Sequence, residues 1–189
     1  MSATLGFVSV RLHAEHGYFG GYLVLNHRAR PLEFHCTLPV KPSRAQTLLY
    51  GPTLDEFVCG EQIARALVTK AKLKPDLLVV DSAAVLGLAH ISDLPLVQLC
   101  TEIVTSPACE RLTLPQLHIA EREKQDDGHA SNTRCTIGEY NFALPANGRA
   151  TEQLLNDIIS QLASHFDLRE PFQRIVEALV EAHPIAKAA

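Results

Sequence analysis

The sequence predicts a single α/β domain in which a mixed β-sheet opens with three antiparallel strands and carries helices packed on it. Three observations indicate this class. Short apolar segments separated by tight turns fill the first forty residues, as in an antiparallel meander. A helical pattern then leads into a continuous apolar run, which is typical of a strand buried on both faces of a parallel sheet. Two amphipathic helical patterns end the chain.

The three opening strands are expected over residues 5–13, 18–26 and 32–40, because each is rich in aromatic and β-branched residues and each is bounded by turn residues. Short turns join them, so neighbouring strands should pair antiparallel. Gly20 and Gly21 interrupt the second strand. Glycine inside a strand predicts either a β-bulge or the close approach of another part of the chain.

A helix is predicted between Thr53 and Pro75. Its apolar residues recur at helical spacing, acidic residues follow Thr53 as the N-cap, and three lysines stand near its end, where the helix dipole favours them. Pro75 ends the helix. Residues 76–80 follow as the predicted central strand, which should return parallel to the first strand.

The second half of the chain is predicted to add strands over residues 94–100, 111–119 and 137–145. The polar segment 121–134 contains no aromatic residue and is expected to form an exposed loop. Residues 148–184 are expected to form a pair of amphipathic helices.

Length and composition suit one globular domain over residues 1–189, because 47% of the residues are hydrophobic and can form a core. The five cysteines are odd in number and contain no C-x-x-C pair, so we expect free thiols and a cytoplasmic location. No apolar run is long enough to span a bilayer, and the N-terminus lacks the pattern of a secretory signal, so no membrane association is expected.

Charge is distributed unevenly along the chain. Residues 1–75 hold nine Lys or Arg against five Asp or Glu, whereas residues 76–189 hold eight against sixteen. This asymmetry predicts either two separate contact surfaces or solvated charges that happen to segregate. The residues predicted to contact a nucleic-acid backbone are Arg28, Arg30, Lys41, Arg44, Lys70, Lys72 and Lys74.

The order of three antiparallel strands, a helix and a parallel strand resembles the opening of the ribonuclease H-like fold. Within it, the segment "YGPTLDEFVCGEQIARALVTKAKLKPDLLVVDSAAVLGLAH", residues 50–90, resembles the central part of endonuclease V. In that family a tyrosine-proline turn opens a helix that carries a glutamate, and a Pro-Asp pair starts an apolar strand that ends in aspartate. The matching residues here are Tyr50, Pro52, Phe57, Pro75, Asp76 and Asp81.

The catalytic carboxylates of this family are largely missing from the chain. The resemblance implies a nuclease with three carboxylates around one or two Mg²⁺ ions, one of them on the first strand. Ser9 and Arg11 occupy the first strand here, and Cys59 stands in the register of the helix glutamate. The family's glycine-histidine segment is replaced by Ser-Ala-Ala at positions 82–84. The resemblance therefore implies the fold with a dismantled site.

Two acidic residues keep a catalytic hypothesis open. Glu61 falls in the apolar stripe of the predicted helix, where a buried carboxylate needs a partner or a metal, and Asp81 ends the central strand. With Glu15 as a third ligand, they would hold Mg²⁺ or Mn²⁺ in a nuclease acting on DNA or RNA. Alternatively, Glu61 pairs with Arg11 or lies at the edge of the stripe, and Asp81 caps the turn that follows it.

The sequence favours a non-catalytic binding or scaffold protein on a degenerate endonuclease V-like core, with a protein partner and no cofactor. A nucleic acid is the second ligand class, through the basic N-terminal half. The metal-dependent nuclease that uses Glu61 and Asp81 is the alternative, and the separation of their two carboxyl groups decides between the two hypotheses.

Overall fold

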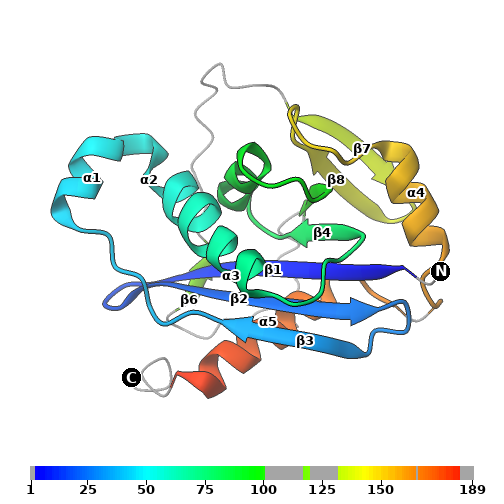
Figure 1. Ribbon diagram of the computed structural model, residues 1–189, viewed down its shortest axis with the longest axis horizontal. Helices are drawn as coiled ribbons and strands as arrows, with labels where there is room; N and C mark the ends of the chain where they lie inside the picture. The colour runs from blue at the N-terminus through cyan, green and yellow to red at the C-terminus, as the bar shows by residue number, and fades with distance from the viewer. Residues whose placement is uncertain (1–2, 101–116, 120–131, 165, 184–189) are drawn as a thin grey trace.

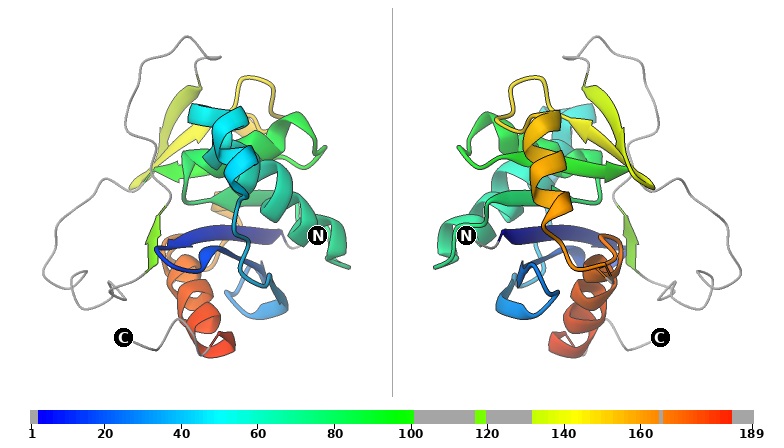
Figure 2. Two further views of the ribbon diagram at one scale, coloured as in Figure 1. Left: turned by 90° about the vertical axis from the view of Figure 1, so that its left-hand side faces the viewer. Right: turned by 90° about the vertical axis from the view of Figure 1, so that its right-hand side faces the viewer.

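The computed structural model describes residues 3–100, 117–119, 132–164 and 166–183 (Figure 1). Seven strands lie side by side in one mixed sheet, in the order β3-β2-β1-β4-β5-β8-β7, and β6 pairs with the end of β1. Helices pack on both faces of this sheet (Figure 2). In the part of the chain that is described, no helix is long and apolar enough to cross a membrane.

The first three strands form the predicted antiparallel meander: β1 (Thr4–His13), β2 (Gly17–Asn26) and β3 (Pro31–Cys36). β1 and β2 pair residue for residue along their whole length. β3 ends earlier than predicted, yet the chain stays beside β2 as far as Val40, which exchanges two backbone hydrogen bonds with Tyr18.

The central strand is also confirmed, since β4 (Leu77–Val80) pairs in parallel with β1. β5 (Leu96–Cys100) adds a second parallel pairing on the other side of β4. Next to it, β8 (Tyr140–Leu144) runs antiparallel to both β5 and β7 (Thr133–Ile137). A short strand, β6 (Leu117–Ile119), pairs antiparallel with the end of β1.

In the second half of the chain, two predicted segments differ from the structure in their limits. The strand predicted over 137–145 is confirmed as β8, which begins three residues later because Gly138, with a φ of 60°, turns the chain between β7 and β8. The loop predicted over 121–134 lies outside the described residues as far as residue 131, and its last two residues begin β7.

The helical segment after β3 begins earlier than predicted. Ser43 caps α1 (Arg44–Tyr50) through a capping box with Gln46, a signal that the sequence contained and the prediction overlooked. The run continues, without a straight α-helix, through the following elements: η1 (Gly51–Thr53), α2 (Leu54–Glu56), η2 (Phe57–Ala64) and α3 (Arg65–Lys70). Of these, η2 is wound as a π-helix.

The sheet separates two apolar cores because strand side chains alternate between its faces. On one face, Val8 and its neighbours pack against η2, α3 and the 3₁₀ helix η3 (Ala83–His90). On the other, Phe7 packs edge-on against Phe172, with ring centroids 5.4 Å apart. Phe172 belongs to α5 (Glu170–Ala182), which together with α4 (Glu152–Ser160) confirms the two predicted C-terminal helices.

The adjacent glycines of β2 let a helix approach on each face. A Cβ atom on Gly20 would lie 2.2 Å from Cγ2 of Ile63 in η2, and one on Gly21 would lie 2.3 Å from Cγ2 of Ile175 in α5. The close approach predicted from these glycines is therefore confirmed. The irregularity in this strand lies elsewhere, as a register shift between Val24 and Leu25.

Glu33 of β3 ties the end of the helical segment to the sheet. Its carboxylate accepts hydrogen bonds from the backbone N–H groups of Lys72 and Leu73, and its Oε1 lies 2.6 Å from Nε2 of His35. The Lys72 N–H group, the His35 ring and the Leu73 N–H group stabilise the carboxylate and lower the pKa of Glu33 to about 2.

The glycine pair gives a first prediction. Gly21→Ala should lower the free energy of unfolding by about 1–3 kcal/mol, because the new methyl group overpacks the contact with α5. Ile175→Ala removes the clashing Cγ2, so the cost of Gly21→Ala should shrink in an Ile175→Ala background. Urea unfolding of the two single variants and the double variant measures this coupling. Additive costs would show that Ile175 does not set the constraint.

Glu33 gives a second prediction. A carboxyl group whose pKa is lowered by folding stabilises the protein above its ordinary pKa, and this contribution is lost as the pH falls towards the folded value of about 2. Glu33→Gln should therefore lower the melting temperature at neutral pH and make little difference near pH 2. Circular dichroism melts across this range test the prediction. Glu15→Gln, at a side chain that is 82% exposed, is the matched control.

Candidate functional site

The candidate site lies where β1 changes its neighbour. Residues 5–8 of β1 pair with β4, and residues 11–13 pair with β6 on the same side. Between these two pairings β4 ends at Val80, and Asp81 follows directly. The carboxyl end of β4 therefore lies beside the middle of β1, at a break in the pairing, and an α/β fold commonly places a ligand site beyond the carboxyl ends of its parallel strands.

Asp81 is buried in this break and is held by two side chains of β1. Ser9 Oγ donates a hydrogen bond to Asp81 Oδ2 at 2.8 Å, and Arg11 Nη2 forms an ion pair with the same oxygen at 2.6 Å. Only 9% of the Arg11 side chain and 5% of the Asp81 side chain are exposed. In this low-dielectric setting a charge-assisted hydrogen bond is strong, and the guanidinium neutralises the carboxylate.

The other Asp81 oxygen, Oδ1, is buried and accepts no hydrogen bond from the described residues. Asp81 also does not cap the next element, as one alternative predicted. Ser82 caps η3 instead, by accepting a hydrogen bond from the backbone N–H of Ala84. The Asp81 carboxylate is thus directed at β1, and its charge is balanced by Arg11.

Cys59 of η2 has a pKa that is affected by the negative charge of Asp81. Its thiol is fully buried, and burial, with the negative charges of Asp55 and Asp81 adding to it, raises the pKa of Cys59 to about 12. The thiol therefore stays protonated at neutral pH, which suits neither a nucleophile nor a metal ligand.

Glu61 does not face Asp81. The side chain is exposed, whereas Cys59, Ile63 and Ala64 are buried. The prediction that Glu61 falls in the apolar stripe is wrong. The buried residues of this helical run recur at Cys59, Ile63 and Leu67, and Glu61 lies outside this set. The alternative that Glu61 pairs with Arg11 is also wrong, since Arg11 pairs with Asp81.

The predicted metal ligands Asp81, Glu61 and Glu15 are not brought together. Glu15 lies in the exposed turn after β1, where its carbonyl accepts a hydrogen bond from Lys41 Nζ. Among the residues whose placement is described, no group of three or more His, Cys, Asp or Glu side chains is arranged to hold a metal ion. The groups that contact Asp81, a hydroxyl and a guanidinium, do not fit Mg²⁺ or Mn²⁺.

The basic residues predicted to contact a phosphate backbone are spread over the molecule. Lys41 and Arg44 follow the end of β3, near the turn between β1 and β2. Arg28 and Arg30 lie in the turn between β2 and β3, next to the start of β1. Lys72 lies near that same end of the sheet, beside Glu33, and Lys74 follows two residues later.

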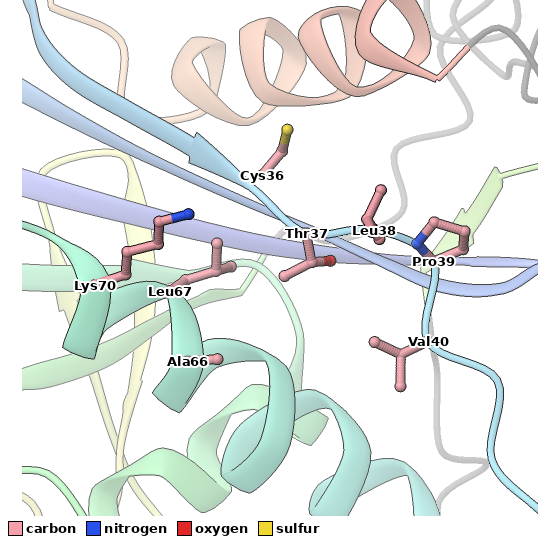
Figure 3. Close-up of a pocket in the computed structure, with 8 residues that line it drawn as sticks. All are labelled: Cys36, Thr37, Leu38, Pro39, Val40, Ala66, Leu67 and Lys70. Atoms are coloured by element: carbon pink, nitrogen blue, oxygen red, sulfur yellow. The ribbon is translucent and has the colours of Figure 1, made fainter.

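Lys70 stands apart from both groups. It lines a shallow hollow of about 400 Å³ between α3 and the segment that follows β3 (Figure 3). The other lining residues are Cys36, Thr37, Leu38, Pro39, Val40, Ala66 and Leu67. This hollow is mainly apolar, and of the seven basic residues predicted to contact a backbone Lys70 alone lines it.

The role of Arg11 in neutralising Asp81 was not predicted. The sequence did contain a signal, since Ser9, Arg11 and His13 are polar residues at alternate positions of a mainly apolar strand. Side chains two apart point to the same face of a strand. A buried polar pair of this kind needs a partner, and the neighbouring parallel strand ends in one.

The ion pair gives a third prediction. Arg11→Met should lower the free energy of unfolding by about 3–5 kcal/mol, because it leaves the Asp81 charge buried without its counter-ion. Asp81→Leu should recover part of this loss when combined with Arg11→Met, and urea unfolding of the four proteins gives the coupling energy. The exposed pair Arg149–Asp93 is the matched control, where Arg149→Met should cost about 0–1 kcal/mol. Equal costs at the two pairs would contradict the prediction.

Comparisons with known proteins identify the fold. No protein-family model and no curated protein sequence matches the chain. Among solved structures, endonuclease V of Ciona intestinalis, crystallised with a 23mer DNA containing an inosine followed by a ribo-adenosine, is similar at 10% sequence identity. The match covers 96% of this chain and 85% of that chain, with a TM-score of 0.52.

Two further structures agree with this match. The complex of the Ciona intestinalis enzyme with a 24mer DNA is 12% identical over 96% of this chain and 86% of that chain, with a TM-score of 0.51. Human ENDOV is 14% identical over 99% of this chain and 87% of that chain, with a TM-score of 0.50. The chain therefore has the endonuclease V-like, ribonuclease H-like fold over nearly its whole length.

Proposed function

We propose that this chain is a non-catalytic binding or scaffold protein built on an endonuclease V-like core. The observation that carries the proposal is the buried ion pair between Arg11 and Asp81. At the end of the central strand, where the family resemblance implies a metal-binding carboxylate, the positive charge beside Asp81 comes from the protein itself.

The surrounding residues support the loss of metal-dependent hydrolysis. A two-metal phosphodiester cleavage needs several carboxylate oxygens that converge on the ions. Among the residues that the structure describes, Asp81 is the one buried acid, and its partners Ser9 and Arg11 offer a hydroxyl and a guanidinium. Metal binding at Asp81 would have to displace the Arg11 guanidinium from a buried position, at the cost of leaving that charge unpaired.

A protein partner is the ligand class that the exposed surface supports best. Helix α1 buries none of its residues, and Leu48 and Leu49 on it are 73% and 85% exposed. The last residue of α1, Tyr50, stacks on Phe57 of η2 with ring centroids 4.0 Å apart. This contact holds α1 in place against η2. Neighbouring exposed apolar side chains on a fixed element favour contact with another protein.

A nucleic acid is the second ligand class, and the two Ciona intestinalis structures contain DNA. Of the basic residues, Lys41 and Arg44 lead into α1, and acidic Asp55, Glu56 and Glu61 follow it on the same helical run. This mixture of charges would support weak backbone contact only. The proposal also includes a cytoplasmic location, in keeping with the free thiols of Cys36, Cys59, Cys100 and Cys135.

A cleavage assay gives the fourth prediction. The wild-type chain, incubated with Mn²⁺ and labelled single- and double-stranded DNA and RNA, including a duplex with an inosine, should produce no cleavage. Asp81→Asn is the matched variant, because it keeps the size of the side chain and removes its charge. Cleavage by the wild type that disappears in Asp81→Asn would overturn the proposal in favour of a metal-dependent nuclease.

The same duplexes test the ligand class by fluorescence anisotropy. We expect binding that is weak and falls steeply as salt is raised. Tight binding that is lost in Lys41→Ala/Arg44→Ala and retained in Arg28→Ala/Arg30→Ala would contradict the proposed protein partner. It would show that the ligand is a nucleic acid. The variant pair at positions 28 and 30 serves as the control because it removes the same number of charges at the opposite end of the sheet.

A further inference from the structure

The segment between Val40 and Leu54 leaves the body of the protein and returns to it. It contains α1 and η1, and we call residues 41–53 the arm. Figure 1 shows α1 standing out at the left of the molecule, away from the sheet. Both flanking residues, Val40 and Leu54, are partly buried and pack against the core that lies between the sheet and η2. The arm is therefore attached to the body at its two ends.

The arm has no apolar core of its own. None of the residues 41–53 is buried. Its helix begins with the capping box, in which Ser43 and Gln46 bind each other and nothing outside the arm among the described residues. A helix of seven residues, as α1 is, is marginal in water when it stands alone. We therefore expect α1 to stay folded only while the arm is held at its ends.

One residue of β2 binds the chain at both ends of the arm. The backbone N–H and C=O groups of Tyr18 exchange two hydrogen bonds of 2.8 Å with Val40, where the arm begins. The hydroxyl of the same residue donates a hydrogen bond to Asp55 Oδ1, just past the point where the arm ends. The Tyr18 side chain is buried, and a hydrogen bond to a carboxylate is stronger than one between neutral groups.

The other contacts of the arm cannot take the place of the Tyr18 hydroxyl. Lys41 Nζ donates a hydrogen bond to the carbonyl of Glu15, but this contact is exposed to solvent. The stack of Tyr50 on Phe57 joins the arm to η2 and not to the sheet. Within the described part of the chain, the hydrogen bond from Tyr18 is the one side-chain hydrogen bond that joins α2 to the sheet.

We propose that the arm opens and closes as one unit and that Tyr18 is the positioning residue that keeps it closed. In the closed arm α1 is folded, and Leu48 and Leu49 are held on one element. In the open arm the Tyr18 hydroxyl and the Asp55 carboxylate separate and α1 unfolds, while β2 keeps its place in the sheet.

The consequence for binding rests on the proposed function, whereas the closure is a property of the chain alone. A partner that contacts the leucines of a folded α1 binds the closed arm. Its apparent affinity falls in proportion to the fraction of molecules in which the arm is closed. Tyr18 thus sets how much of the protein is ready to bind, from a strand that the partner does not contact.

Amide hydrogen exchange gives the fifth prediction. Tyr18→Phe removes the hydroxyl and keeps both the ring and the backbone hydrogen bonds to Val40. The amides of α1 should then exchange about tenfold faster, because opening the arm no longer breaks a hydrogen bond to a carboxylate. The amides of β1 should exchange at the wild-type rate. Mass spectrometry of peptic fragments, after exchange of the whole chain at neutral pH, measures both segments.

Tyr22→Phe is the matched control. Tyr22 lies on the same strand and the same face of the sheet as Tyr18, and its buried hydroxyl has no hydrogen-bond partner among the described residues. The same atom is therefore removed without loss of a hydrogen bond, and α1 should exchange as in the wild type. The double variant Tyr18→Phe/Asp55→Ala should exchange no faster than the faster of its two single variants, because both changes break one bond.

Tryptic cleavage after Arg44 is an independent measurement of the same opening. Arg44 is the first residue of α1, and the folded helix protects the peptide bond that follows it. At low trypsin concentration the rate of cleavage follows the population of the open arm. Tyr18→Phe should therefore be cut about tenfold faster at this bond than the wild type, and Tyr22→Phe should be cut at the wild-type rate.

Either of two results would overturn the proposal. Equal exchange of α1 in the wild type and in Tyr18→Phe would show that the hydroxyl does not hold the arm. An equal acceleration of α1 and β1 would show that the hydroxyl stabilises the whole fold and that the arm does not open separately. Cleavage of nucleic acid by the wild type would contradict the proposed function and leave the closure of the arm unaffected.

Discussion

The burial of Asp81 is the constraint on which the site depends. A carboxylate at the end of a central strand, closed in by helices, is unfavourable unless its charge is balanced. Arg11 supplies that balance from β1, and Ser9 adds a neutral hydrogen bond to the same oxygen. The ion pair links two strands at the point where β4 ends and their direct pairing stops. A structural pair thus stands where the resemblance implies a metal.

The packing around this pair is equally constrained. η2 approaches η3 closely, because a Cβ atom on Gly60 would lie 3.0 Å from the backbone nitrogen of Leu88. This contact positions the neighbouring Cys59 in the interior, where burial and nearby carboxylates keep its thiol protonated. Gly20 and Gly21 similarly let Ile63 and Ile175 approach β2 from opposite faces. Glycine residues therefore allow the close contacts of η2 with η3, and of β2 with η2 and α5.

The edge of the sheet has a different character from the site. At the site a charge is buried and paired within one chain, whereas at β3 apolar side chains and backbone groups are left uncovered. α5 explains this difference, since it packs on β1 and β2 and stops short of β3. Contact with another molecule at such a surface needs shape and apolar area and no reactive group.

Much of the fold was predictable from local patterns. The meander, the central strand and the two C-terminal helices follow from apolar periodicity and turn residues, because a buried face must repeat with the period of its element. The capping box at Ser43 was present in the sequence and was overlooked. β7 was missed, since its sequence is mostly polar and it pairs with β8 through a turn at one glycine with positive φ.

The site was less predictable for a physical reason. Periodicity groups the apolar residues of a helix, but which side of the helix faces the sheet depends on packing, and here Cys59, Ile63 and Ala64 are buried while Glu61 is exposed. The sequence by itself determined the strand order at the start of the sheet, the glycine pair that admits two helices, and the lack of an acid on β1. Only the tertiary structure decided that Arg11 neutralises Asp81, because these residues are seventy positions apart and meet only through the pairing of β1 with β4.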